Sequence, residues 1–101
     1  MAEQAVLDGH VVVPMDDVLA WARWFESADR VVAQTGIGEA KVSTVFLGNN
    51  HSWGDGPPQW FETMVFGGPL DGEQDRYETW EQAEVGHAAM CERIQKAKET
   101  P

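Results

Sequence analysis

The chain has 101 residues, of which 43% are hydrophobic, and it carries a formal net charge of −10 at pH 7. Its length is typical of one domain, so we expect residues 1–101 to form a single domain, and the hydrophobic content argues against a wholly disordered chain. The negative charge repels phosphates, which disfavours nucleic-acid binding and docking on anionic membranes. It suits a partner protein with a basic surface instead.

Cysteine usage and the absence of targeting segments indicate where the protein acts. Cys91 is the only cysteine, so no intramolecular disulfide can form, and a reducing compartment fits. The N-terminus lacks the basic segment and apolar run of a signal peptide, and no stretch approaches the ~20 apolar residues of a membrane span. We therefore expect a cytoplasmic protein.

The first predicted elements are a β-hairpin and a helix. The hairpin covers residues 5–13, because the turn-forming pair Asp8-Gly9 separates two apolar runs. The helix is expected from about residue 17 to 29, with Asp16 as the N-cap residue. Apolar residues recur on one broad face of this helix, so we expect that face to pack on a sheet.

Three strands are expected in the middle of the chain, over residues 31–35, 41–47 and 60–66, because β-branched and aromatic residues dominate these segments. Both faces of the resulting sheet carry apolar side chains. In the third strand, one face has Trp60, Met64 and Phe66 and the other has Phe61 and Val65. A homodimer or another partner could shield the face that the helices leave open.

The last helix is expected from Trp80 to about Ala97. Thr79 is its N-cap, and Gln82 completes a capping box. Gly86 lies at the edge of the apolar face, where it could let a strand approach closely. The apolar face consists of Trp80, Ala83, His87, Met90, Cys91 and Ile94. Together these elements predict an α+β fold, an antiparallel sheet of three to five strands with two helices packed on one face.

The loop over residues 48–59 is the best candidate binding site. It is long and rich in glycine and proline, and it holds His51, Trp53 and Asp55 just before Trp60. Long loops with a titratable imidazole and an aromatic side chain often bind ligands. The alternative is a structural loop in which Trp53 covers the edge of the core.

Two further hypotheses concern small ligands and metals. A nucleotide signal could stack on Trp53 or Trp60 and place a phosphate on Arg76. A metal-dependent enzyme could use His51, His87 and Glu62. However, the sequence has no HExxH, paired CxxC or DxDxDG motif. We therefore expect no cofactor and no catalytic residue, and a buried, neutral and hydrogen-bonded His87.

Acidic residues cluster late in the chain. They are Asp71, Glu73, Asp75, Glu78, Glu81 and Glu84, with Arg76 as the only basic residue among them. This segment could present a negative surface to a basic partner, or it could be an ordinary solvated loop and helix face.

Several phrases of the sequence together resemble small uncharacterised proteins of tailed bacteriophages and prophages. The resemblance covers about residues 10–94, and its phrases include WARWFE, VSTVFLG, FETMVFGG, RYETW and GHAAM. It implies a viral origin and a bacterial-cytoplasm setting, and it carries over no activity or site residue. We therefore expect a non-enzymatic phage accessory protein that binds a host or phage macromolecule, for example to counteract a host defence.

Overall fold

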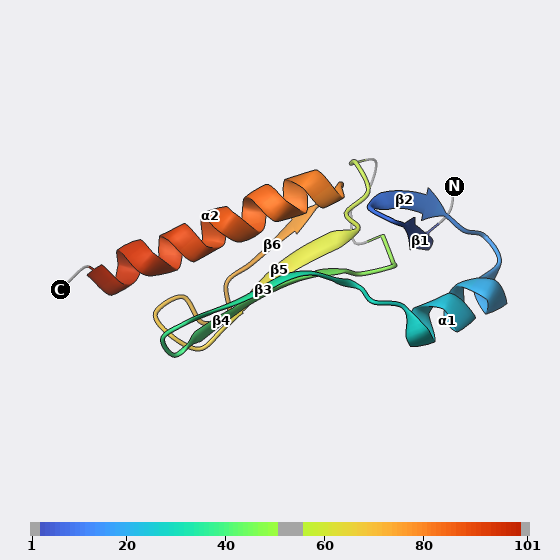
Figure 1. Cartoon of the computed structure of the whole chain (residues 1–101). Coiled ribbons are helices and arrows are strands. Elements are labelled where there is room, and N and C mark those ends of the chain that lie inside the picture. The colour runs from blue at the N-terminus through green and yellow to red at the C-terminus, as the bar shows by residue number, and fades with distance from the viewer. Residues whose placement is uncertain (1–2, 51–55, 100–101) are drawn as a thin grey trace.

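The computed structural model describes residues 3–50 and 56–99 (Figure 1). The described residues form short strands and two helices of unequal length. In chain order they are β1 (Ala5–Asp8), β2 (Val11–Pro14), α1 (Val18–Ser27), β3 (Val31–Ile37), β4 (Ala40–Phe46), β5 (Phe61–Phe66), β6 (Gln74–Tyr77) and α2 (Trp80–Glu99).

The strands form two antiparallel sheets. β1 and β2 form a two-stranded hairpin, and the other four form a sheet in the order β3-β4-β5-β6. The α+β class and the antiparallel sheet are thus confirmed. Figure 1 shows α2 lying along the four-stranded sheet, whereas α1 lies beside the hairpin.

The hairpin is where the sequence predicts it, but its turn lies one residue later. Asp8 pairs with Val11, so the two turn residues are Gly9 and His10 rather than Asp8 and Gly9. Gly9 has a φ of 63°, whereas His10 does not have a positive φ, because only glycines have one in the described segments. A positive φ at the first turn position only is the pattern of a type II′ turn, whereas type I′ needs it at both.

Helix α1 begins one residue later than expected, because Asp17 and not Asp16 is its N-cap. The Asp17 carboxylate accepts a hydrogen bond from the backbone N–H of Ala20 at 3.1 Å, which satisfies one of the free donors of the first turn. The helix contacts β1, and the indole N–H of Trp21 donates to the Ala5 carbonyl at 3.0 Å. No residue of α1 is buried.

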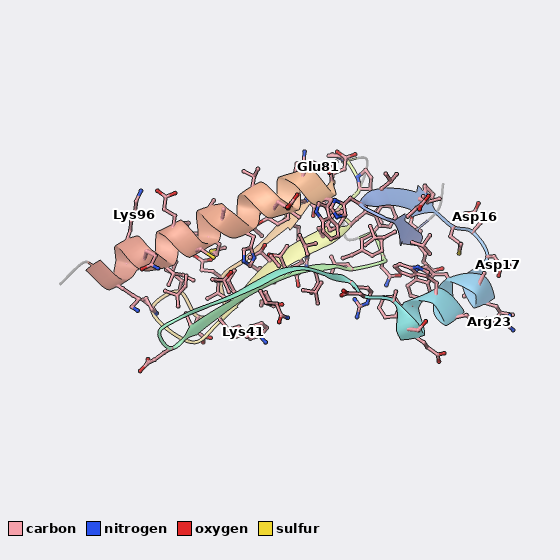
Figure 2. The ribbon with its side chains drawn as sticks, in the orientation of Figure 1. Asp16, Asp17, Arg23, Lys41, Glu81 and Lys96 are labelled. Atoms are coloured by element: carbon pink, nitrogen blue, oxygen red, sulfur yellow. The ribbon has the colours of Figure 1, made fainter. Side chains whose placement is uncertain are left out.

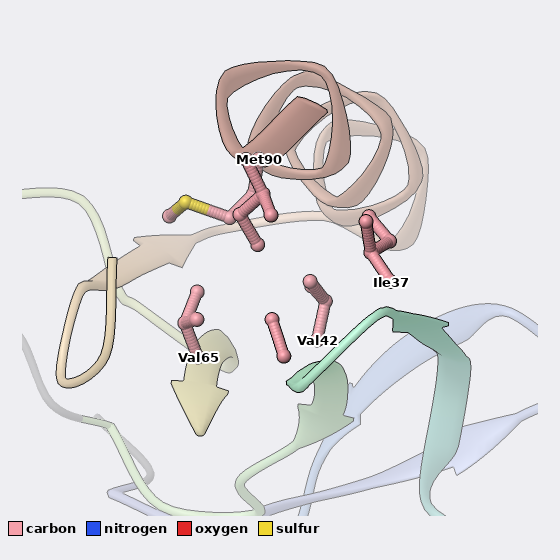
Figure 3. Close-up of a cluster of buried hydrophobic side chains, with 6 residues drawn as sticks. Ile37, Val42, Val65 and Met90 are labelled. Atoms are coloured by element: carbon pink, nitrogen blue, oxygen red, sulfur yellow. The ribbon is translucent and has the colours of Figure 1, made fainter. Parts of the chain in front are cut away.

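Helix α2 covers one face of the four-stranded sheet and forms most of the core. Its predicted capping box is confirmed: the Gln82 backbone N–H donates to Thr79 Oγ1 at 3.1 Å, and the Thr79 backbone N–H donates to Gln82 Oε1 at 3.3 Å. Figure 3 shows the cluster beneath the helix, in which Met90 faces the sheet. The cluster comprises Ile37, Ala40, Val42, Val65, Met90 and Ile94.

A second cluster joins the sheet to the hairpin. It consists of Ala5, Phe46, Trp60, Phe61 and Ala83, with Trp24 and Trp80 packed against it. The Trp24 and Phe46 rings pack edge to face, with centroids 5.8 Å apart. This aromatic cluster is the main link between the α1 end of the molecule and the sheet.

The other face of the four-stranded sheet is left open by both helices. Along β4 and β5, buried and less buried residues alternate, as expected when one face packs on a core. The open face combines the half-exposed Phe66 with an ion pair between Arg76 and Glu62. The four-stranded sheet thus has apolar side chains on both faces, as the sequence predicts.

Candidate functional site

A pocket of about 370 Å³ lies between β2 and the start of α2. Its walls come from three segments far apart in the sequence, and three of the wall residues are aromatic or imidazole rings. The lining residues are His10, Val11, Val12, Pro14, Trp60, Glu78, Thr79, Trp80 and Glu81. The pocket is therefore a small, mostly apolar site with a few polar groups, as ligand- and side-chain-binding pockets usually are.

The aromatic walls are held in place by packing on the core. The His10 and Trp80 rings stack with centroids 3.8 Å apart and planes within 7°. Trp80 also meets Phe61 edge to face, with centroids 6.2 Å apart. Trp60 is only 5% exposed, and its backbone N–H donates to the Tyr77 carbonyl at 2.9 Å. These contacts hold the walls of the pocket in place.

One polar group at this site lacks a partner. The indole N–H of Trp80 is buried and has no hydrogen-bond partner within the described residues. A buried donor without a partner costs about 1–3 kcal/mol. Among the described residues, the pocket wall thus carries one unsatisfied buried donor.

The charges around the pocket are negative. Glu78 and Glu81 are exposed at its rim, and neither forms an ion pair in the part of the chain that the structure describes. Among the residues that the structure describes, no lysine or arginine lines the pocket. Figure 2 shows Glu81 at the hairpin end of α2 and Lys96 near the other end. These two carboxylates lie at the N-terminal end of α2, where the helix dipole favours negative charge, and their own charge repels phosphates.

The loop residues of the first sequence-based site cannot be placed. His51, Trp53 and Asp55 lie outside the described residues. Trp60, which follows that loop, is part of the pocket wall, but it is too buried to offer a free face to a nucleotide base.

The predicted phosphate ligand Arg76 is engaged elsewhere. Its Nε donates to Glu62 Oε2 at 2.9 Å on the open face of the sheet, and it does not line the pocket. The structure therefore does not bring Trp60 and Arg76 together at the pocket, because β6 places Arg76 opposite Glu62.

The acidic segment is only partly free. The Asp71 carboxylate accepts from the Gly67 backbone N–H at 2.6 Å, Glu73 pairs with Arg93 of α2 at 2.9 Å, and Asp75 accepts from the Arg76 backbone N–H at 3.0 Å. These three residues stabilise a turn, a helix contact and an edge strand. Of the other three acidic residues of the segment, Glu78 and Glu81 line the pocket, whereas the exposed Glu84 does not.

Two of the three candidate metal ligands, His87 and Glu62, lie on opposite faces of the sheet. His87 binds two threonines on the α2 side of the sheet, whereas Glu62 points to the open face, so the two cannot share an ion. In residues 3–50 and 56–99, no group of three or more His, Cys, Asp or Glu side chains could hold a metal ion.

His87 instead completes a buried chain of hydrogen bonds across the sheet. Its Nε2 lies 2.8 Å from Thr35 Oγ1 and its Nδ1 2.7 Å from Thr44 Oγ1. Thr44 contacts Thr63 at 2.5 Å, and the Tyr77 hydroxyl donates to Thr63 at 3.1 Å. Burial lowers the pKa of His87, and the resulting neutral ring suits this chain because it accepts one hydrogen bond and donates one.

The end of this chain at Tyr77 explains the predicted role of Gly86. A side chain at position 86 would overlap the Tyr77 ring, because an added Cβ would lie 2.2 Å from two of its carbons. The glycine thus lets β6 and α2 approach, as the sequence indicates. Burial is the main cause of the raised pKa of Tyr77, and the Asp75 charge also raises it.

No protein-family model, curated protein or solved structure matches this chain. None of the helices in the described segments has the length and apolar character needed to cross a membrane. The pocket itself was not found from the sequence, because His10 and Trp80 are 70 positions apart and only the fold brings their rings together. The sequence signals were Trp60, which is a candidate ligand-binding residue from the sequence alone, and the acidic cluster that contains Glu78 and Glu81.

Proposed function

We propose that this chain is a non-enzymatic binding protein that captures a basic segment of a protein partner. The observation that carries the proposal is the pocket at the start of α2, where His10, Trp60 and Trp80 form walls beside two carboxylates that have no ion pair among the described residues. The net charge of −10 adds to the attraction for a basic partner and raises its association rate.

A single arginine or lysine side chain fits this arrangement. Its methylene stem packs against the rings of His10 and Trp80, and its charged group reaches the carboxylates of Glu78 and Glu81. An arginine gains more than a lysine, because its planar guanidinium also stacks on aromatic rings and binds carboxylates with two hydrogen bonds. The partner would be anchored by such a side chain, as interfaces commonly are.

The resemblance to phage proteins indicates the setting in which this interaction would occur. In this proposal the chain is a phage accessory protein in the bacterial cytoplasm, and its partner is a host or phage protein, for instance a component of a host defence. A catalytic role is not proposed, because His87 is enclosed by threonine hydroxyls and does not line the pocket.

The proposal is tested by titration with capped tripeptides that differ only in the central residue. We expect the peptide with a central arginine to bind, the peptide with lysine to bind more weakly, and the peptide with glutamate not to bind. Binding is followed by the NMR signal of the Trp80 indole N–H, identified by its loss in Trp80→Phe. Added salt should weaken binding, because the attraction is between opposite charges.

Two double variants separate the pocket from the overall charge. Glu78→Gln with Glu81→Gln should weaken the arginine peptide about tenfold, since two partly solvated charge contacts are lost. Glu26→Gln with Glu39→Gln changes the net charge by the same amount at exposed sites away from the pocket, and its affinity should stay within about twofold. Equal losses in both variants, or equal binding of the arginine and glutamate peptides, would contradict the proposal.

A further inference from the structure

The two edges of the four-stranded sheet differ in how they are protected. β6, at one edge, has four residues with the sequence QDRY, so a charged pair lies on the edge itself. β3, at the other edge, has seven residues with the sequence VVAQTGI and neither charge nor proline. Natural edge strands that stay unpaired are usually short, charged or interrupted, because an open edge is a template for another strand. By this criterion β6 is protected against pairing with another strand, and β3 is not.

The regular part of β3 leaves backbone groups facing outward. The irregularity in its pairing with β4 is confined to Val31–Ala33, so Ala33–Ile37 runs in regular register. In an antiparallel pair, the backbone N–H and C=O groups of successive residues point alternately toward the partner strand and away from it. Ile37, next to the two-residue turn, points its groups toward β4, so the backbone groups of Gly36 and Gln34 point away from β4. Both residues are exposed, and a Cβ added at Gly36 would meet no atom within 4 Å.

We propose that this edge pairs with the β3 strand of a second copy of this chain. The pairing is antiparallel about a twofold axis, with Thr35 opposite its own copy and Gln34 opposite Gly36 of the second copy. In this register, the outward N–H and C=O groups of Gln34 in each copy form hydrogen bonds with those of Gly36 in the other copy. The result is a continuous sheet of eight strands. Both α2 helices then lie on the same face.

The charge pattern of β3 favours a second copy over another partner. In a twofold contact each residue meets the same surface patch, so any net charge on the strand would repel its copy. A chain with a net charge of −10 would resist self-association over most of its surface. Because β3 has no charged residue, pairing there avoids close contacts between like charges.

The size of the contact sets its expected strength. A strand pair of five residues is much smaller than a standard interface, so we expect a reversible dimer that forms as the concentration rises. Salt should strengthen it, because screening reduces the repulsion between two negatively charged chains. This response is opposite to that expected for peptide capture at the pocket, so the dimer and the proposed function can each fail without the other.

Sedimentation equilibrium over a range of protein concentrations tests the proposal. The mass of the wild-type chain should rise from 11.2 kDa toward twice that value, and more steeply in high salt. Gly36→Pro removes the outward N–H and should keep the protein monomeric. Gly36→Ala keeps the N–H and has room for its methyl group, so it should dimerise like the wild type.

Amide hydrogen exchange on the wild-type protein gives a second test that does not depend on a variant folding. Exchange at Gln34 and Gly36 should slow as the concentration rises, whereas exchange in β6 should not change. A wild-type chain that stays monomeric, exchange rates at both positions that do not vary with concentration, or a folded Gly36→Pro variant that still dimerises would overturn the proposal.

Discussion

The two helices show that an apolar pattern alone does not decide how deeply a helix is buried. Seven of the ten residues of α1 are apolar, yet none of them is buried. α2 is more polar, but its Ala83, His87, Met90 and Ile94 are buried, because this helix lies across a four-stranded sheet. α1 has only the narrow hairpin and one aromatic cluster to pack on. Stability therefore resides mainly under α2, and the candidate binding pocket lies where α2 begins, at the hairpin.

The largest effect that would sharpen this comparison is expected from one truncation in each helix. Ile94 in α2 is fully buried in the core cluster, so Ile94→Ala should lower the free energy of unfolding by about 2–5 kcal/mol. Leu19 in α1 is 71% exposed, and Leu19→Ala should change it by less than about 0.5 kcal/mol. Urea unfolding measures both. Similar losses would contradict the division between the helices.

A smaller effect is expected within β4, where neighbouring residues point to opposite faces. Thr44→Val keeps the shape of the side chain but leaves His87 Nδ1 and the Thr63 hydroxyl without their buried partner, so we expect a loss of about 1–3 kcal/mol. Ser43→Ala removes only an exposed hydrogen bond with Gln34 and should cost less than about 0.5 kcal/mol. Equal costs in urea unfolding would show that the buried chain of hydrogen bonds contributes nothing of its own.

The smallest effect is a dependence of stability on pH through His87. Its pKa in the folded protein is below the ordinary value of 6.5, because burial disfavours the imidazolium. Below pH 6.5 the unfolded chain binds a proton that the folded chain does not, so the free energy of unfolding should decrease as pH falls. The slope of the unfolding free energy against pH is at most about 1.4 kcal/mol per unit. Well above pH 6.5, His87 is neutral in both the folded and the unfolded chain, so its contribution no longer changes with pH.

Comparison with His87→Gln isolates this contribution from the other titrating groups. The difference in unfolding free energy between the wild type and this variant should fall as the pH is lowered from 7.5 to 5.5. A difference that does not depend on pH would mean that the pKa of His87 is the same in the folded and the unfolded chain. The region under α2 would then be less enclosed than the 6% exposure of His87 indicates.

The sequence predicts best the features that depend on neighbouring residues. The capping box of Thr79 and Gln82 and the apolar face of α2 are local patterns, and both are confirmed. The hairpin is confirmed as well, but its turn is shifted to Gly9 and His10, because the register between β1 and β2 depends on both strands. The same limit applies at α1, where two adjacent aspartates both fit the N-cap position.

Three other features depend on long-range contacts and were not predicted. Strand β6 has a polar sequence with no apolar alternation, and it is a strand because its backbone pairs with β5. That pairing also joins Arg76 to Glu62, which removes Arg76 from the nucleotide site that the sequence indicates. The pocket likewise arises from His10, Trp60 and Trp80, which only the complete fold brings together.

The position of α2 after all six strands affects how the chain acquires its core during synthesis. Ribosomes make the strands first, so the inner face of the sheet, including Val42 and Val65, has no cover until Met90 and Ile94 have been added. Nascent chains that stop before α2 would present this face to other polypeptides and to chaperones. We therefore expect premature stop codons before position 80 to yield aggregated or degraded product rather than a smaller folded domain.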